Sequence, residues 1–159
     1  MTSNTSQLPD AAETAAWHKR FAIDCNNRSW GLSVAARTPA EDKEMLDTAH
    51  AAAWHWGHVG DELNRMRATT LLAEVHALLG MGRSALAFAQ EIRDYFGRAG
   101  VADWEMALVY TVYAHAAHAA GLTAEHREAH ANAAAAIEAI ADEEDRKVIL
   151  ATFAQVPAP

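Results

Sequence analysis

The chain has 159 residues, of which 51% are hydrophobic and 21% are charged, and its formal net charge is −8 with histidine neutral. This length and composition predict one domain with a substantial core. The negative charge and the lack of any Lys/Arg cluster argue against a surface for nucleic acid or for an anionic membrane. A single cysteine, no signal-peptide pattern and no apolar run of about 18 residues favour a cytoplasmic protein without a membrane span.

The N-terminal part of the chain predicts a long helix. Asp10 and Glu13 form a capping-box pattern at its start. Asn26 and Gly31 weaken the helical pattern, so the sequence leaves open whether residues 10–36 form one helix or two. The spacing of its apolar side chains predicts one buried stripe, formed by Trp17, Phe21, Cys25 and Leu32.

Caps and glycines divide the rest of the chain into further helices. Thr38-Pro39-Ala40-Glu41 is a strong start signal for a helix that ends near Gly57 or Gly60. Asp103 and Thr123 are the expected caps of two later helices. Helical periodicity between such signals predicts the remaining helices over 61–80, 83–97, 103–121, 123–141 and 143–154.

A ten-residue pattern recurs in this chain. Residues 71–80 return 41 residues later as residues 112–121, and each copy ends on glycine before a second helical pattern. Such an echo is typical of stacked helical hairpins, and short loops make consecutive helices antiparallel neighbours. We therefore expect a disordered tail over 1–9 and one all-α domain over 10–156, a right-handed stack of about seven helices. It would consist of three hairpins and a C-terminal capping helix, over 10–58, 62–98, 103–141 and 143–154.

The second hairpin resembles a tetratricopeptide repeat (TPR), a family of helical hairpins with small residues at the helix crossing and glycine in the turn. The residues that carry this resemblance are Ala73, His76, Gly80, Ala85, Ala89 and Ile92. The third hairpin follows the same register with Ala114, Ala117, Gly121, His126, His130 and Ala133. The register places His126 and His130 at packing positions, although the period of 41 exceeds the usual 34 of the family.

The TPR-like resemblance implies a binding or scaffold module with a concave groove, lined by the first helix of each hairpin. The register puts seven predicted site residues there: Arg67, Thr70, Glu74, Leu108, Thr111, His115 and His118. These groups suit a small polar ligand, a peptide or a protein partner. The alternative is a solvated helix face with incidental charges. No catalytic motif supports an enzyme, and a homodimer formed through an apolar edge is a further alternative.

Other stretches resemble a group of small uncharacterised bacterial proteins, and this resemblance implies no activity. They are residues 37–39, 49–60 and 140–146.

The histidines of the second predicted helix give a competing hypothesis. His55 and His58 are three residues apart, and His50 and His58 are eight apart on one stripe with Trp54. His50, His55 and His58 are thus candidate ligands for a divalent metal, although we predict no cofactor. The same hypothesis allows a small cofactor-binding protein or an acid–base enzyme that uses these histidines or His115 and His118. The opposing interpretation of a Trp-rich stripe is that it belongs to the core.

Overall fold

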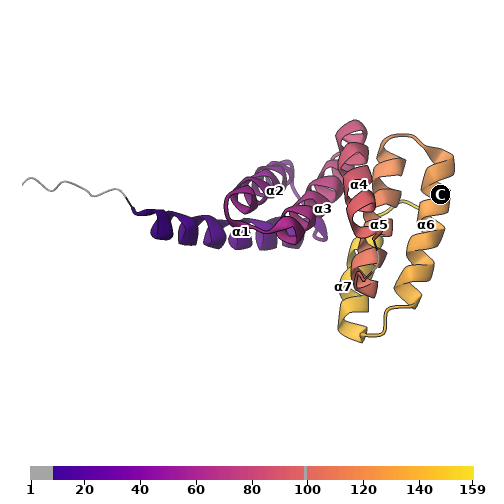
Figure 1. Cartoon of the computed structure of the whole chain (residues 1–159). Coiled ribbons are helices and arrows are strands. Elements are labelled where there is room, and N and C mark those ends of the chain that lie inside the picture. Colours follow the sequence, from indigo (N-terminus) through magenta and orange to yellow (C-terminus); the bar gives the residue numbers. More distant parts are fainter. Residues whose placement is uncertain (1–8, 99) are drawn as a thin grey trace, which may run out of the picture.

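The computed structural model describes residues 9–98 and 100–159, and all regular structure in these ranges is helical (Figure 1). This confirms an all-α fold of about seven helices. The tail expected over 1–9 lies outside the described residues except for Pro9. The helices are α1 (Ala11–Ser33), α2 (Pro39–Val59), α3 (Glu62–Leu78), α4 (Gly82–Phe96), α5 (Asp103–Ala119), α6 (Thr123–Glu138) and α7 (Glu143–Phe153).

Helix α1 is one continuous helix of 23 residues, which answers the question that the sequence left open. Its capping box is complete: the Asp10 carboxylate accepts from the Glu13 amide, and the Glu13 carboxylate accepts from the Asp10 amide. Thr38 and Glu41 make the same reciprocal bonds at the start of α2. These caps satisfy amides that have no partner within the helix, and so they fix where both helices begin.

The helices pair as three hairpins, α1–α2, α3–α4 and α5–α6, and α7 packs against α5 and α6 (Figure 1). The two copies of the echo end α3 and α5 with the same backbone turn. Gly80 and Gly121 have φ angles of 70° and 75°. The amide after each glycine bonds five residues back, Met81 to His76 and Leu122 to Ala117. This is the Schellman motif, and it is why glycine recurs at this position of the echo.

The core lies along the middle of the stack. Small residues let the helices approach closely: Ala73 and Ala114, which hold the same place in the two echoes, are both fully buried. Gly82, at the start of α4, lies directly against the end of α5. A Cβ atom at this position would lie 2.2 Å from the carbonyl oxygen of Ala119, which is too close for any side chain. The largest fully buried side chains include Phe96, Met45, Leu71, Ile92, Ile137 and Ile140.

Two predictions about local structure are wrong. The stripe on α1 is not buried at its start, since Trp17 is 54% exposed and Phe21 is 43% exposed, whereas Leu32 is buried. The first half of α1 runs beyond α3, and α2 is the one helix of the described ranges beside it (Figure 1). Helices α5 and α6 begin at their expected caps instead of after them. The Asp103 carboxylate accepts from the Ala141 amide, which ties the start of α5 to the loop before α7, and from the Trp104 amide. These bonds, first that from Ala141, lower the pKa of Asp103.

No helix within the described ranges is long and apolar enough to cross a membrane.

Candidate functional site

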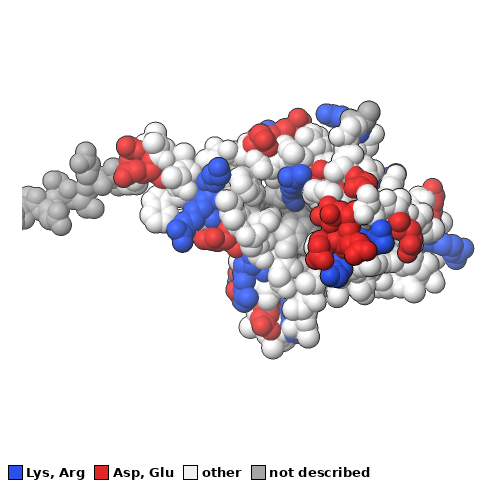
Figure 2. All heavy atoms as spheres, turned by 90° about the horizontal axis from the view of Figure 1, so that it is seen from below, with Lys and Arg blue, Asp and Glu red and all other residues white. Residues whose placement is uncertain are grey.

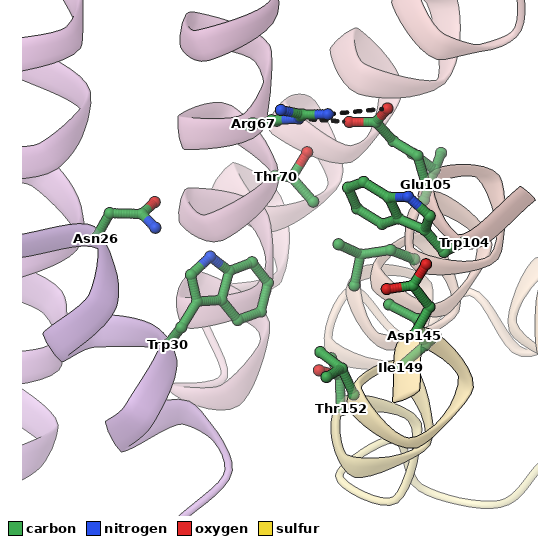
Figure 3. A pocket seen from close by; sticks show the side chains of 12 residues that line it. Asn26, Trp30, Arg67, Thr70, Trp104, Glu105, Asp145, Ile149 and Thr152 are labelled. Carbon is green, nitrogen blue, oxygen red and sulfur yellow. Dashed lines mark hydrogen bonds and ion pairs between the residues drawn. The ribbon is translucent and has the colours of Figure 1, made fainter. Parts of the chain in front are cut away.

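A cavity of about 300 Å³ lies where four helices meet, and we call it the concave cavity (Figure 3). Three of these helices, α1, α3 and α5, are the first helices of the three hairpins. The fourth, α7, packs against α5 and α6. The lining residues are Asn26 and Trp30 of α1, Arg67 and Thr70 of α3, Trp104, Glu105, Leu108 and Val109 of α5, and Asp145, Val148, Ile149 and Thr152 of α7.

An ion pair closes one end of the concave cavity. Arg67 Nε lies 2.7 Å from Glu105 Oε1, and Arg67 Nη2 lies 3.4 Å from Glu105 Oε2. The Glu105 side chain is 9% exposed and that of Arg67 is 45% exposed. The Arg67 guanidinium also lies over the Trp104 ring, 5.4 Å from its centroid. The pair therefore links α3 to α5 and neutralises the one cation that lines the cavity.

Two tryptophans and three shorter polar side chains face the space between the helices. Trp30 and Trp104 stand on different walls, and the Asn26 amide and the Asp145 carboxylate point into the cavity (Figure 3). The Thr70 hydroxyl donates to the carbonyl oxygen of Met66, which leaves its oxygen able to accept a bond. Apolar walls with a few fixed polar groups are typical of small-molecule sites.

The surface beside the concave cavity is acidic. The N-cap and first turn of α7 carry four successive acids, Asp142, Glu143, Glu144 and Asp145. Figure 2 shows a cluster of acidic residues beside the hollow of this face, over the start of α7. The Asp142 carboxylate accepts from the amides of Glu144 and Asp145, so it caps the helix. The Asp145 carboxylate takes no part in that cap.

The predicted groove residues fall into three places. Arg67, Thr70 and Leu108 line the concave cavity. His118 is exposed at the far end of α5, where it lines a separate hollow with His126. The others, Glu74, Thr111 and His115, are buried between α3 and α5. The reason is that α3 and α5 pack directly on each other along the echo, so that only their earlier turns are left facing the groove.

Glu74 and His115 form the most deeply buried polar contact between the hairpins. They hold the same place in the two echoes, and Glu74 Oε1 lies 3.0 Å from His115 Nδ1. Their side chains are 0% and 6% exposed, and Glu74 Oε2 has no hydrogen-bond partner within the described part of the chain. The contact links α3 to α5 across two almost fully buried side chains.

Sequence reasoning missed most of the concave cavity. Trp104 and Glu105 precede Leu108 by four and three residues, so helical spacing places all three on one face and could have found them. Trp30 and Asn26 lie outside the echo, as do all four residues from α7. Their positions follow from how the hairpins stack, and the local pattern carries no signal for it.

Of the three histidines proposed as metal ligands, His55 and His58 meet at His18, whereas His50 lies apart from them. His50 Nε2 lies 3.1 Å from His76 Nε2, whereas His55 Nδ1 lies 2.9 Å from His18 Nδ1 and the His58 ring stacks on His18. Residues five apart on a helix are about 140° apart around its axis, which separates His50 from His55. Among the described residues, no three His, Cys, Asp or Glu side chains are arranged to hold a metal ion.

The contact between His50 and His76 belongs to a chain of hydrogen bonds. The Ser84 hydroxyl donates to the Met81 carbonyl, so it accepts from Nδ1–H of His76. In the neutral form of His76, Nε2 then accepts from Nε2–H of His50. Burial, and secondly the neighbouring His50, lower the pKa of His76. The chain holds a neutral His76 against the start of α4.

An aromatic patch lies on the outer part of α1 and α2, away from the concave cavity. Trp54 is 60% exposed, and its ring centroid lies 4.5 Å from that of His58. The expectation that the Trp-rich stripe belongs to the core is therefore wrong for Trp54. Burial, and then His18 and His58, lower the pKa of His55. The aromatic patch consists of Trp17, His18, Phe21, Trp54, His55 and His58.

Comparison with protein-family models, with curated proteins and with solved structures finds no match for this chain.

Proposed function

We propose that the protein is a TPR-like binding module that captures a small ligand in the concave cavity. The observation that carries this proposal is the convergence of four helices on a preformed apolar space with tryptophans on different walls and a fixed ion pair at one end. Preformed pockets of roughly this size and character suit small molecules.

The chemistry of the lining favours binding over catalysis. None of the residues that line the concave cavity is histidine or cysteine, and its buried carboxylate, Glu105, is held by Arg67. Cys25 is half-buried on α1, and burial followed by the charge of Asp24 raises the pKa of its thiol. A thiol with a raised pKa is a poor nucleophile at neutral pH.

The position of α7 favours a small ligand over an extended peptide. In an open stack of hairpins the groove continues past the last repeat, and an extended chain can lie along it. Here α7 packs on α5 and supplies one wall of the cavity through Ile149 and Thr152. The space is closed on that side, so the groove becomes a pocket.

A pair of substitutions on α7 tests this proposal. Val148 is 65% exposed and lines the concave cavity, so Val148→Trp should fill its mouth without disturbing the core. Leu150 is 44% exposed on the same helix but lines a different hollow, so Leu150→Trp is the matched control. Ligand-observed NMR would screen a fragment library of amines, alcohols and carboxylic acids against the wild type and both variants.

We expect fragments that bind the wild type and the Leu150→Trp variant and lose at least tenfold in affinity for the Val148→Trp variant. Circular dichroism should show both variants folded. The proposal fails if the fragments that bind do so equally well to the Val148→Trp variant, or if no fragment binds the wild type.

A further inference from the structure

We propose that the ligand of the concave cavity is a small organic amine: a protonated nitrogen on an apolar body of one ring or a short chain. This inference rests on the proposed function, since it names the chemistry of the ligand for the same cavity. The observations that carry it are the unmatched charge of the lining and the two indole rings.

The carboxylates of the concave cavity outnumber its cations. Arg67 neutralises Glu105 through two contacts. Asp145, half-buried and pointing into the cavity, makes no ion pair within the described part of the chain (Figure 3). The acidic first turn of α7, in which, among the described residues, Lys147 pairs with Glu144 alone, adds negative potential at the same rim (Figure 2). A cation that enters the cavity gains a partner at Asp145, whereas an anion meets uncompensated negative charge.

The aromatic rings suit the same ligand. The face of an indole ring attracts cations, and one cation already uses it here, because Arg67 lies over Trp104 while paired with Glu105. Trp30 offers a second indole on another wall of the cavity (Figure 3). Leu108, Val109 and Ile149 supply apolar surface for the body of the ligand.

A neutral or anionic ligand fits the concave cavity less well. A neutral ligand that covered Asp145 would strip water from a carboxylate without replacing its interactions, and this costs free energy. An anion that approached Arg67 would meet a guanidinium whose charge Glu105 already neutralises, and it would lie beside that carboxylate. An amine leaves the ion pair intact.

Three compounds with one body test the charge preference: 4-phenylbutylamine, 4-phenylbutanol and 4-phenylbutyrate. Isothermal titration calorimetry at neutral pH would measure their dissociation constants. We expect the amine to bind about tenfold more tightly than the alcohol, as for one hydrogen bond to a charged group, and the carboxylate to bind most weakly. Raising the salt concentration should reduce the difference between the dissociation constants of the amine and the alcohol.

Variants of Asp145 test whether the preference for the amine depends on this one carboxylate. Asp145→Asn should bring the affinity of the amine close to that of the alcohol, and Asp145→Glu should keep most of the preference. Asp94→Asn is the matched control, because it removes the same charge from an exposed position on α4, away from the cavity. Circular dichroism would check that each variant is folded.

The inference is overturned if the alcohol or the carboxylate binds the wild type as tightly as the amine, or if the Asp145→Asn variant keeps the full preference. It is also overturned if a short lysine-containing peptide binds more tightly than the amine, since the occupant would then be a basic peptide. If all three compounds bind the wild type equally and Val148→Trp abolishes their binding, the preference for an amine is refuted. The proposed function, binding in the concave cavity, would then still hold. If Val148→Trp changes the binding of none of them, the proposed function fails as well.

Discussion

Glu74 and His115 form a buried polar contact between the second and third hairpins. Within the described part of the chain, neither side chain has a hydrogen-bond partner other than this one. Removing one member of such a pair leaves a buried polar group that neither water nor protein satisfies. The pair is therefore expected to matter far more for folding than its single contact suggests.

We predict that Glu74→Ala or His115→Ala lowers the free energy of unfolding by about 3–5 kcal/mol, as measured by urea denaturation. Replacing both residues by Leu should recover much of this loss, because it removes both polar groups and retains apolar volume. The exposed pair of Arg28 and Glu44 is the control, and Glu44→Ala should have a much smaller effect. A loss below about 1 kcal/mol for both single Ala variants would show that the contact is not structural.

The residue scale is also where the sequence was least informative. The echo places Glu74 and His115 in the same register, and the TPR-like resemblance predicts that this register faces a groove. The two residues face each other instead, because α3 and α5 pack along the echo. The register of a repeat specifies which side of a helix a residue is on, but the angle at which two helices cross decides whether that side meets solvent or the next helix.

At the scale of elements, some helix ends could be predicted because their signals are complete and local, unlike the caps expected at Asp103 and Thr123. The capping boxes at Asp10 and Thr38 and the glycines at 80 and 121 act within one turn of the chain, so the sequence contains everything they need. The burial of α1 could not be predicted in the same way. Trp17 and Phe21 have the spacing of a core stripe, but no third helix covers them.

Substitutions at two glycines compare a position that packs against another helix with a position that faces open space. Gly82→Ala would place a Cβ atom against the backbone of Ala119, so α4 and α5 would have to move apart, and we predict a loss of about 1–3 kcal/mol in the free energy of unfolding. Gly31→Ala meets no atom within 4 Å in helix α1, and should stabilise the protein by about 0.5–1 kcal/mol. Urea denaturation would measure both changes. Equal effects of the two substitutions would contradict the close contact between α4 and α5.

At the scale of the whole molecule, the histidines make stability depend on pH. The pKa values of His55, His76 and His130 are all lowered, in each case first by burial and then by neighbouring histidines. The unfolded chain, with histidine pKa values near 6.5, therefore binds protons before the folded chain does. The contribution of these histidines to the free energy of unfolding is fully present above that pH. It is lost as the pH falls towards their lowered pKa values.

We predict that the melting temperature stays level between pH 8 and 7 and falls as the pH is lowered from about 6.5 to 5. Differential scanning calorimetry at low protein concentration would measure it. His76→Gln should reduce the slope, because it removes one of the three groups. A melting temperature that rises over this interval would mean that the histidines gain partners when protonated, contrary to the neutral hydrogen-bond chain from His50 to Ser84.

The concave cavity is a property of the whole molecule, and this explains how little of it the sequence predicted. Arg67, Thr70 and Leu108 came from the repeat register. Asp145 and the apolar residues of α7 could not, because α7 lies outside the echo and reads only as an end cap. The acids in its first turn also suit the helix dipole, a local role that gives no sign of a cavity beside them.

The five tryptophans allow one measurement to test the central claim, that the concave cavity is where ligands bind. Two of them, Trp30 and Trp104, line the cavity, and Trp17 and Trp54 belong to the aromatic patch. The measurement is a titration with 4-phenylbutylamine, followed by the indole N–H signals in ¹H–¹⁵N NMR spectra. We predict that the signals of Trp30 and Trp104 shift together and saturate while those of Trp17 and Trp54 stay in place. Shifts confined to Trp17 and Trp54, or no shift of any indole signal, would contradict the account.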